Sequence, residues 1–169
     1  MTLSMSALTL PAVERALTNL SAILDKGLTH AKATGIDPDT LVQARLAPDM
    51  LTLAGQVQRA SDSAKGLVAR LAGVDNPSMA DDETSFAQLQ DRIARTLAFV
   101  RGVDRKLLDG SETRTVTLPV RGQTITLGGQ AYLMGFALPN IHFHVTTAYA
   151  ILRHNGAPLG KLDYLGPLA

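Results

Sequence analysis

The chain has 169 residues, 46% of them hydrophobic and 18% charged, which fits one globular domain over residues 1–169 and excludes a disordered protein. Sixteen basic and fifteen acidic residues leave a formal charge of +1, which argues against nucleic-acid binding by phosphate neutralisation. The absence of cysteine excludes disulfides, thiolate nucleophiles and thiolate metal ligands.

The first twenty residues, MTLSMSALTLPAVERALTNL, have neither the basic start nor the long apolar core of a secretion signal. The sequence also contains no uninterrupted apolar run of the roughly 18 residues that a membrane-spanning helix needs. Together these features predict a cytoplasmic protein without a membrane-spanning segment.

The first predicted helix covers residues 10–35. Apolar residues recur there at alternating steps of three and four, as on one face of an amphipathic helix. Pro11 suits the first turn of this helix, and Gly35 suits its C-cap. The apolar face consists of Val13, Leu17, Leu20, Leu24, Leu28 and Ala31.

A short helical connector over residues 37–46 leads to the second long helix. The apolar repeat resumes at Pro48, includes Met50, and ends at Gly73. Asp49 is then expected in the first turn, where the helix dipole favours an acidic side chain.

A polar loop over residues 74–84 precedes the third long helix, predicted over residues 85–104. Ser85 and Gln88 have the spacing of a capping box at its start. The apolar residues that follow recur at the helical period, so this helix is also expected to bury one face.

The segment 111–128 changes the pattern to alternating β-branched and polar residues around a break at Pro119–Gly122, which predicts a small hairpin lying on the helices. The last helix is predicted over residues 129–155, with a local break at Pro139. A tail rich in Gly and Pro runs back over the bundle, with Lys161 and Asp163 paired. The predicted fold is all-α, a four-helix bundle with a small β-hairpin inserted before the last helix.

Three of the four histidines lie in the last predicted helix. At about 100° per residue, His142, His144 and His154 point in three directions, and no pair has the i, i+4 spacing of a helical zinc pair. His154, at the end of its helix, is expected to donate to exposed C-terminal carbonyls, as is His30 near the end of the first helix.

His144 shares a helix face with apolar residues and with Asn140 one turn earlier, so both side chains are expected to face the bundle. An unpaired buried polar group costs about 1–3 kcal/mol, so both need hydrogen-bond partners. Two interpretations stay open: a ligand pocket lined by His144 and Asn140, or a core histidine that only bonds a neighbouring helix.

His142 shares the other face with Tyr149 and Arg153. Mixtures of aromatic and basic side chains are common at protein interfaces. We therefore expect these three residues at the surface or at a contact between subunits.

The sequence FHVTTAYAILRHNGAPLGKLDYLG (143–166) is similar to the last-helix signature of the DinB/YfiT-like superfamily, in which Arg follows a histidine by nine residues and Gly follows it by twelve, as Arg153 and Gly156 follow His144. With RLAPDM (45–50), the whole chain resembles one uncharacterised bacterial family of that superfamily. The resemblance implies a four-helix bundle, often a homodimer. Many such proteins hold a divalent metal with three histidines, and some are thiol transferases or related enzymes.

The resemblance implies one metal-binding histidine on the second helix and a pair four residues apart on the last. Only His144 matches, because Asn140 stands four residues before it. Gln56 and Gln58 lie in the right region of the second helix, but neutral amides are poor ligands for zinc or nickel. The other candidate ligands are Asp49, Asp62 and, remotely, His30, and neither carboxylate is clearly aimed at His144.

No cofactor is therefore expected, and zinc or nickel at His144 is the alternative. One hypothesis is a homodimeric binding protein that holds a small ligand in a pocket lined by His144, Asn140 and Gln56, in place of the lost metal site. The second is a metal-dependent DinB-type transferase or hydrolase with a remodelled site around His144. The sequence leaves open whether the protein is an enzyme.

Overall fold

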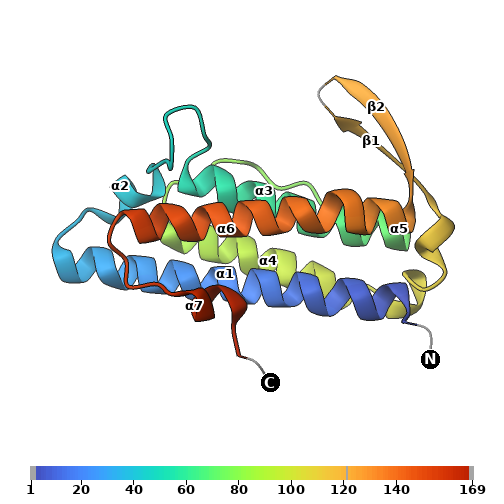
Figure 1. The fold of residues 1–169 in the computed structure, drawn as a ribbon, viewed down its shortest axis with the longest axis horizontal. Coiled ribbons are helices and arrows are strands. Elements are labelled where there is room, and N and C mark those ends of the chain that lie inside the picture. Colours follow the sequence, from blue (N-terminus) through green and yellow to red (C-terminus); the bar gives the residue numbers. More distant parts are fainter. Residues whose placement is uncertain (1–2, 121, 168–169) are drawn as a thin grey trace.

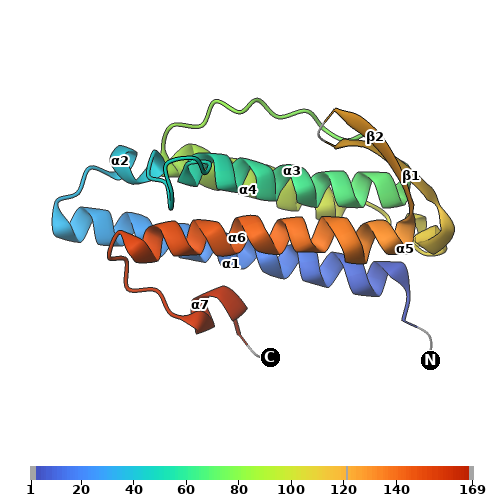
Figure 2. The same ribbon diagram turned by 45° about the horizontal axis from the view of Figure 1, so that its top comes forward.

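The structure, a computed structural model, describes residues 3–120 and 122–167. Four long helices pack side by side as a bundle (Figures 1 and 2), which confirms the predicted all-α fold with a hairpin before the last helix. The long helices are α1 (Met5–Thr34), α3 (Leu53–Ala72), α4 (Phe86–Gly102) and α6 (Leu138–His154). The shorter elements are α2 (Pro38–Val42), β1 (Thr115–Val120), β2 (Gln123–Gly128), α5 (Gly129–Tyr132), a π-helical turn (Leu133–Ala137), α7 (Lys161–Leu165) and two 3-10 turns (Arg105–Leu107 and Ser111–Thr113).

The connection between α3 and α4, residues 74–85, crosses the length of the bundle, as the thin green trace above α3 in Figure 2 shows. Because of this crossover, α3 and α4 run in the same direction, and so do α1 and α6 (Figure 1). The antiparallel neighbours are α3 with α6 and α1 with α4. Each long helix therefore has one parallel and one antiparallel neighbour.

The first helix begins earlier than predicted, at Met5 instead of residue 10. The Ser4 side chain caps it by accepting a hydrogen bond from the backbone N–H of Ala7. Pro11 consequently lies inside the helix and not in its first turn. A proline there removes one backbone hydrogen bond, but burial of the apolar side chains before it stabilises the added turns. The C-cap at Gly35 is as predicted, with a left-handed φ of 72°.

The second long helix begins later than predicted, at Leu53 instead of Pro48. The reason is again a capping side chain, because the hydroxyl of Thr52 accepts from a backbone N–H of the first turn. Asp49 and Met50 therefore lie in the preceding turn, not on α3. The prediction that Asp49 lies in the first turn of this helix is therefore wrong. The prediction that Met50 lies on its apolar face is wrong as well.

The hairpin pairs β1 with β2 in antiparallel register, from Thr115 opposite Gly128 to Val120 opposite Gln123. Val116 and Leu118 of β1 are buried and belong to the bundle core, as expected for a hairpin that lies on the helices. Arg121, inside the predicted break, lies outside the described residues.

The predicted break at Pro139 is displaced: the chain stays helical from residue 129 to 154, and a π-helical turn over Leu133–Ala137 lies just before Pro139 at the start of α6. The missing N–H of Pro139 accounts for the irregular turn before it. The tail returns to α1 through α7 (Figure 1). The predicted partner of Asp163 is wrong: Nζ of Lys26 on α1, and not Lys161, lies 2.6 Å from its carboxylate.

The bundle core is apolar and contains side chains from all four long helices and from the hairpin. Over residues 3–120 and 122–167, none of the helices has the length and apolar character that crossing a membrane requires.

Candidate functional site

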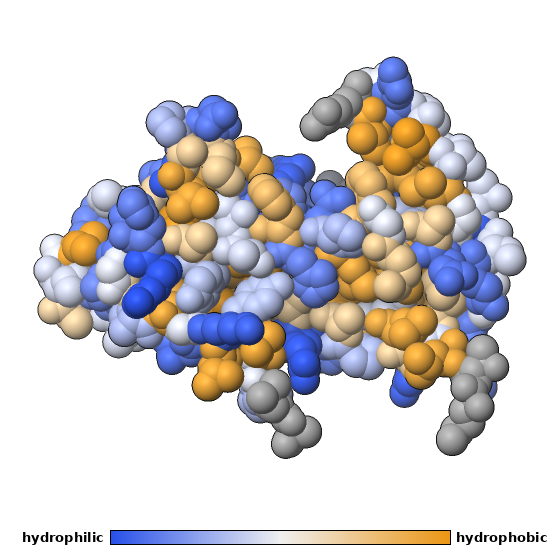
Figure 3. All heavy atoms as spheres, in the orientation of Figure 1, coloured by the Kyte–Doolittle hydropathy of each residue, from blue (hydrophilic) through white to orange (hydrophobic). Residues whose placement is uncertain are grey.

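A cleft of about 290 Å³ lies between α3 and α6, against the hairpin. In Figure 3 the molecular surface is hollowed on this side, between the hairpin and the loop that precedes α3. The hairpin and the π-helical turn give the cleft an apolar wall. Its polar lining consists of Arg59, Asp62, Ser63, Arg70, Asn140 and His144.

The geometry of His144 is fixed by a buried amide. Its Nδ1 lies 2.8 Å from Oε1 of Gln56, a residue that is only 1% exposed. The amide nitrogen of Gln56 donates to the carbonyl of Leu51 at 3.3 Å, so its oxygen is the atom that faces the imidazole. His144 therefore donates from Nδ1, and its Nε2 keeps a free lone pair. The structure thus brings together two of the three predicted pocket residues.

His144 is held in its neutral form. Burial lowers the pKa of His144 below its usual 6.5, and the positive charge of Arg59 lowers that pKa further. At pH 7 the imidazole is accordingly uncharged. Such a ring can accept a hydrogen bond or take up a proton at Nε2.

Asn140, the third predicted pocket residue, lines the same cleft but does not bond His144. Its Nδ2 donates to the carbonyl of Phe136, one turn earlier, at 2.6 Å. The amide oxygen of Asn140 remains as an acceptor for a ligand.

Arg70 also belongs to the cleft, although no sequence pattern pointed to it. Its Nη1 donates to the hydroxyl of Tyr132 at 3.1 Å, and its guanidinium carbon lies 5.9 Å from the centre of that ring. A methyl group at Gly66 would collide with the same nitrogen. The glycine therefore gives Arg70 room to fold back along α3.

A buried ion cluster lies beside the cleft and was also missed. Arg92 on α4 is 0% exposed and donates to Glu83 Oε1 and to Asp62 Oδ1, both at 2.9 Å. Lys65 lies 3.0 Å from the same oxygen of Asp62. Burial on its own would raise the pKa of Glu83, but hydrogen bonds from Arg92 and Gln58 outweigh it, and the pKa is lowered.

The residues around His144 do not fit the metal site that the resemblance implies. Asp62, which the sequence did not direct towards His144, lines the cleft, but its carboxylate is already paired with Arg92 and Lys65. Arg59 adds positive charge that opposes a cation. In the described part of the chain, no three His, Asp or Glu side chains lie close enough together to hold a metal ion.

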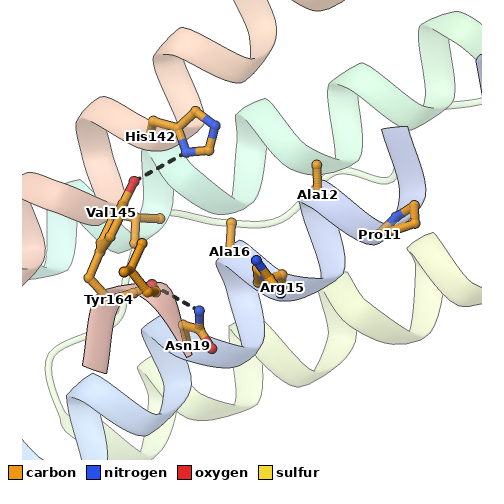
Figure 4. A pocket seen from close by; sticks show the side chains of 9 residues that line it. Pro11, Ala12, Arg15, Ala16, Asn19, His142, Val145 and Tyr164 are labelled. Carbon is orange, nitrogen blue, oxygen red and sulfur yellow. Dashed lines mark hydrogen bonds between the residues drawn. The ribbon is translucent and has the colours of Figure 1, made fainter. Parts of the chain in front are cut away.

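The three predicted interface residues lie along α6, outside the cleft. His142 is exposed, but its Nδ1 is 3.2 Å from the hydroxyl of Tyr164 in the tail (Figure 4). Tyr149 is half-buried, and Arg153 is exposed and donates at 3.5 Å to the carbonyl of Ala157. His142 is thus partly covered by its own chain.

The remaining histidines lie at the opposite end of α6 from the hairpin. Nε2 of His30 is 3.1 Å from the carbonyl oxygen of Asn155, so His30 contacts the C-terminus of α6 and not that of its own helix. His154 is exposed in the last turn of α6. His30 is therefore no ligand partner for His144, which sits ten residues before His154.

Comparisons with known proteins agree with this fold. The profile of a family described as "Domain of unknown function (DUF1993)" matches residues 5–165. A crystal structure of a DinB family member protein from Shewanella denitrificans is similar with a TM-score of 0.91 and 41% sequence identity, over 96% of this chain and 92% of that chain. None of the curated proteins matches the chain.

Proposed function

Because the chain belongs to the DUF1993 family of DinB-like bundles, we propose that it binds a small polar ligand in the cleft between α3 and α6. This ligand takes the place that a three-histidine metal site has in other DinB-like proteins. The observation that carries the proposal is the hydrogen bond that Nδ1 of His144 donates to the amide oxygen of Gln56, which leaves Nε2 of a neutral imidazole to accept a hydrogen bond from a ligand.

The charges of the cleft favour an uncharged or anionic ligand. Arg70 lines it and makes no ion pair within the described residues, whereas Arg59 pairs with Asp62 and Asp81. Asp62, the acidic residue among its lining, is also paired with Arg92 and Lys65. The volume of the cleft, about 290 Å³, is near the lower limit of ligand pockets. A compact ligand with a donor group for His144 matches these properties.

NMR of the histidine ring signals tests this proposal with a library of small polar fragments. We expect some fragments to shift the signals of His144 and to leave those of His154 unchanged. Replacing Gln56 with methionine releases Nδ1 of His144, and we expect it to weaken binding of such fragments by about tenfold, the equivalent of one hydrogen bond. A library without any fragment that shifts His144, or equal binding by Gln56→Met, contradicts the proposal.

A metal-dependent transferase or hydrolase is the second candidate function. The lone pair on Nε2 of His144 favours it, because a neutral imidazole is a common metal ligand. Elemental analysis of protein purified without chelators separates the two candidates. Near-stoichiometric zinc or nickel that is lost in His144→Ala supports the enzyme, and protein free of these metals supports the binding protein.

We also propose that two copies associate through the side of α6 that carries Tyr149 and Arg153. Phe143, an aromatic residue of the same helix that is 55% exposed, adds apolar surface that such a contact could cover. Sedimentation should show a dimer that Tyr149→Ala converts to a monomer. A monomeric parent protein, or a dimeric variant, rules this contact out. The cytoplasmic location stays a prediction that cell fractionation can check.

A further inference from the structure

A second cavity, of about 390 Å³, lies between α1, α6 and α7 on the side of α6 that carries His142 (Figure 4). Three short side chains of α1 leave this space open, namely Pro11, Ala12 and Ala16. Val145 of α6 lies across from them. The volume falls within the range of small-molecule pockets, about 300–1,000 Å³.

The C-terminal tail forms one wall of this cavity. Asn19, 6% exposed, donates from Nδ2 to the carbonyl of Tyr164 at 2.9 Å, and the hydroxyl of Tyr164 reaches His142 (Figure 4). Gly166 has a φ of 72°, and a methyl group on it would collide with the amide of Asn19. Glycine is thus required there both for its backbone conformation and for close contact.

The permanently charged side chain among the described lining residues of this cavity is that of Arg15. Arg15 is exposed and lines it together with His142, and none of the described lining residues is acidic. Within the described residues, Arg15 makes one side-chain hydrogen bond, to the carbonyl of Pro167 at 3.5 Å, which is at the limit of such bonds. An arginine has five N–H donors, so most of them remain available to a ligand.

We propose that this cavity binds a small organic carboxylate. Its hydrocarbon or aromatic body lies against Ala16 and Val145, and its carboxylate pairs with Arg15. The apolar lining provides the affinity for the body, since burial contributes about 25 cal/mol per Å². The guanidinium matches a carboxylate with two parallel hydrogen bonds. This site is separate from the cleft around His144 and does not depend on the function proposed there.

Titration of the full chain with benzoate and hexanoate tests the proposal, with benzamide and hexanamide as uncharged counterparts. We expect saturable binding of the acids in calorimetry, with shifts of the NMR signals of Ala12, Ala16 and Val145. The amides should bind about tenfold more weakly, because they lose the charge-assisted pair.

Arg15→Gln should reduce binding of the acids to the level of the amides, whereas Arg95→Gln, an exposed position on α4, should not. Ala12→Leu fills the cavity and should abolish binding, whereas Ala98→Leu on the exposed side of α4 should not. Arg15 is exposed, so its variant is expected to fold even if Ala12→Leu does not.

Equal affinity for acids and amides, or unchanged binding by Arg15→Gln, overturns the proposal. Gln56→Met alters the other cleft and should leave this binding unchanged. If Gln56→Met instead removes it, the acids bind around His144, and the cavity of α1, α6 and α7 is not their site.

Discussion

Replacing Arg92 with methionine tests how much the buried ion cluster stabilises the crossover connection. Arg92 on α4 is 0% exposed, and its guanidinium donates to two groups of that connection, the carbonyl of Ala80 at 2.7 Å and Glu83 at 2.9 Å. It also pairs with Asp62 of α3 and Asp81 of the connection. Methionine keeps much of the apolar volume and removes every one of these donors.

The expected loss is dominated by Glu83. Its side chain is only 3% exposed, and removing one partner of a buried ion pair typically destabilises a protein by about 3–5 kcal/mol. The side chains of Asp62 and Asp81 are 28% and 38% exposed, so water can solvate them, and each exposed pair contributes at most about 1 kcal/mol. We therefore expect Arg92→Met to lower the free energy of unfolding by about 4 kcal/mol.

Urea unfolding followed by circular dichroism measures this loss. With a slope of about 2 kcal/mol per M, the midpoint should fall by about 2 M. Adding Glu83→Gln removes the unpaired charge and should recover part of the loss. Arg95→Met, at an exposed position of the same helix, should stay within about 0.5 kcal/mol of the parent protein. Equal midpoint shifts in Arg92→Met and Arg95→Met, or a double variant less stable than Arg92→Met, would show that the pairing of Arg92 with Glu83 does not stabilise the connection.

Three other predictions concern stability. As the pH falls below 6.5, the unfolded chain takes up a proton on His144 before the folded protein does, so the free energy of unfolding should decrease, and less so in His144→Gln. Ser85→Ala removes the N-cap of α4 and should cost about 1 kcal/mol. In Gly129→Ala the new methyl group would collide with the carbonyl of Ser111, so this variant should be far less stable than Gly135→Ala, where the added group meets open space.

Urea unfolding at several pH values checks all three predictions. A parent protein and a His144→Gln variant with identical pH dependence would show that His144 titrates normally in the folded state. Full stability of Ser85→Ala would mean that the N-terminus of α4 is held by other contacts. Equal stability of the two glycine variants would show that the junction with α5 can shift to accept a side chain.

The apolar spacing predicted the bundle because the buried faces of α1, α3, α4 and α6 follow the same helical period. The helix starts predicted from Pro11 and Pro48 are both wrong. The structure instead begins these helices after Ser4 and Thr52, because a capping hydroxyl satisfies backbone N–H groups that a proline cannot. A search for capping side chains near each predicted start would have found both.

The candidate site was predicted only in part. His144 and Gln56 could be placed near each other because helix direction and the family resemblance agreed. The ion cluster was missed because Asp62, Glu83 and Arg92 are distant in sequence, and Glu83 comes from a segment whose composition resembles a solvated loop. The available signal was Arg92 itself, which stands three residues after Leu89 and therefore on nearly the same face of α4 as that apolar residue.

The crossover also limits how the length of this chain can vary. Most surface loops tolerate deletions, because the helices or strands that they join lie close together and a shorter loop can still connect them. Here α3 rises about 30 Å over its 20 residues, and the connection must cover a similar distance back to the start of α4. About 12 residues reach about 41 Å when fully extended, so the slack equals only about three residues. Homologous chains should therefore gain or lose residues elsewhere, and a shortening of four or more between Gly73 and Phe86 would require a different order of helices.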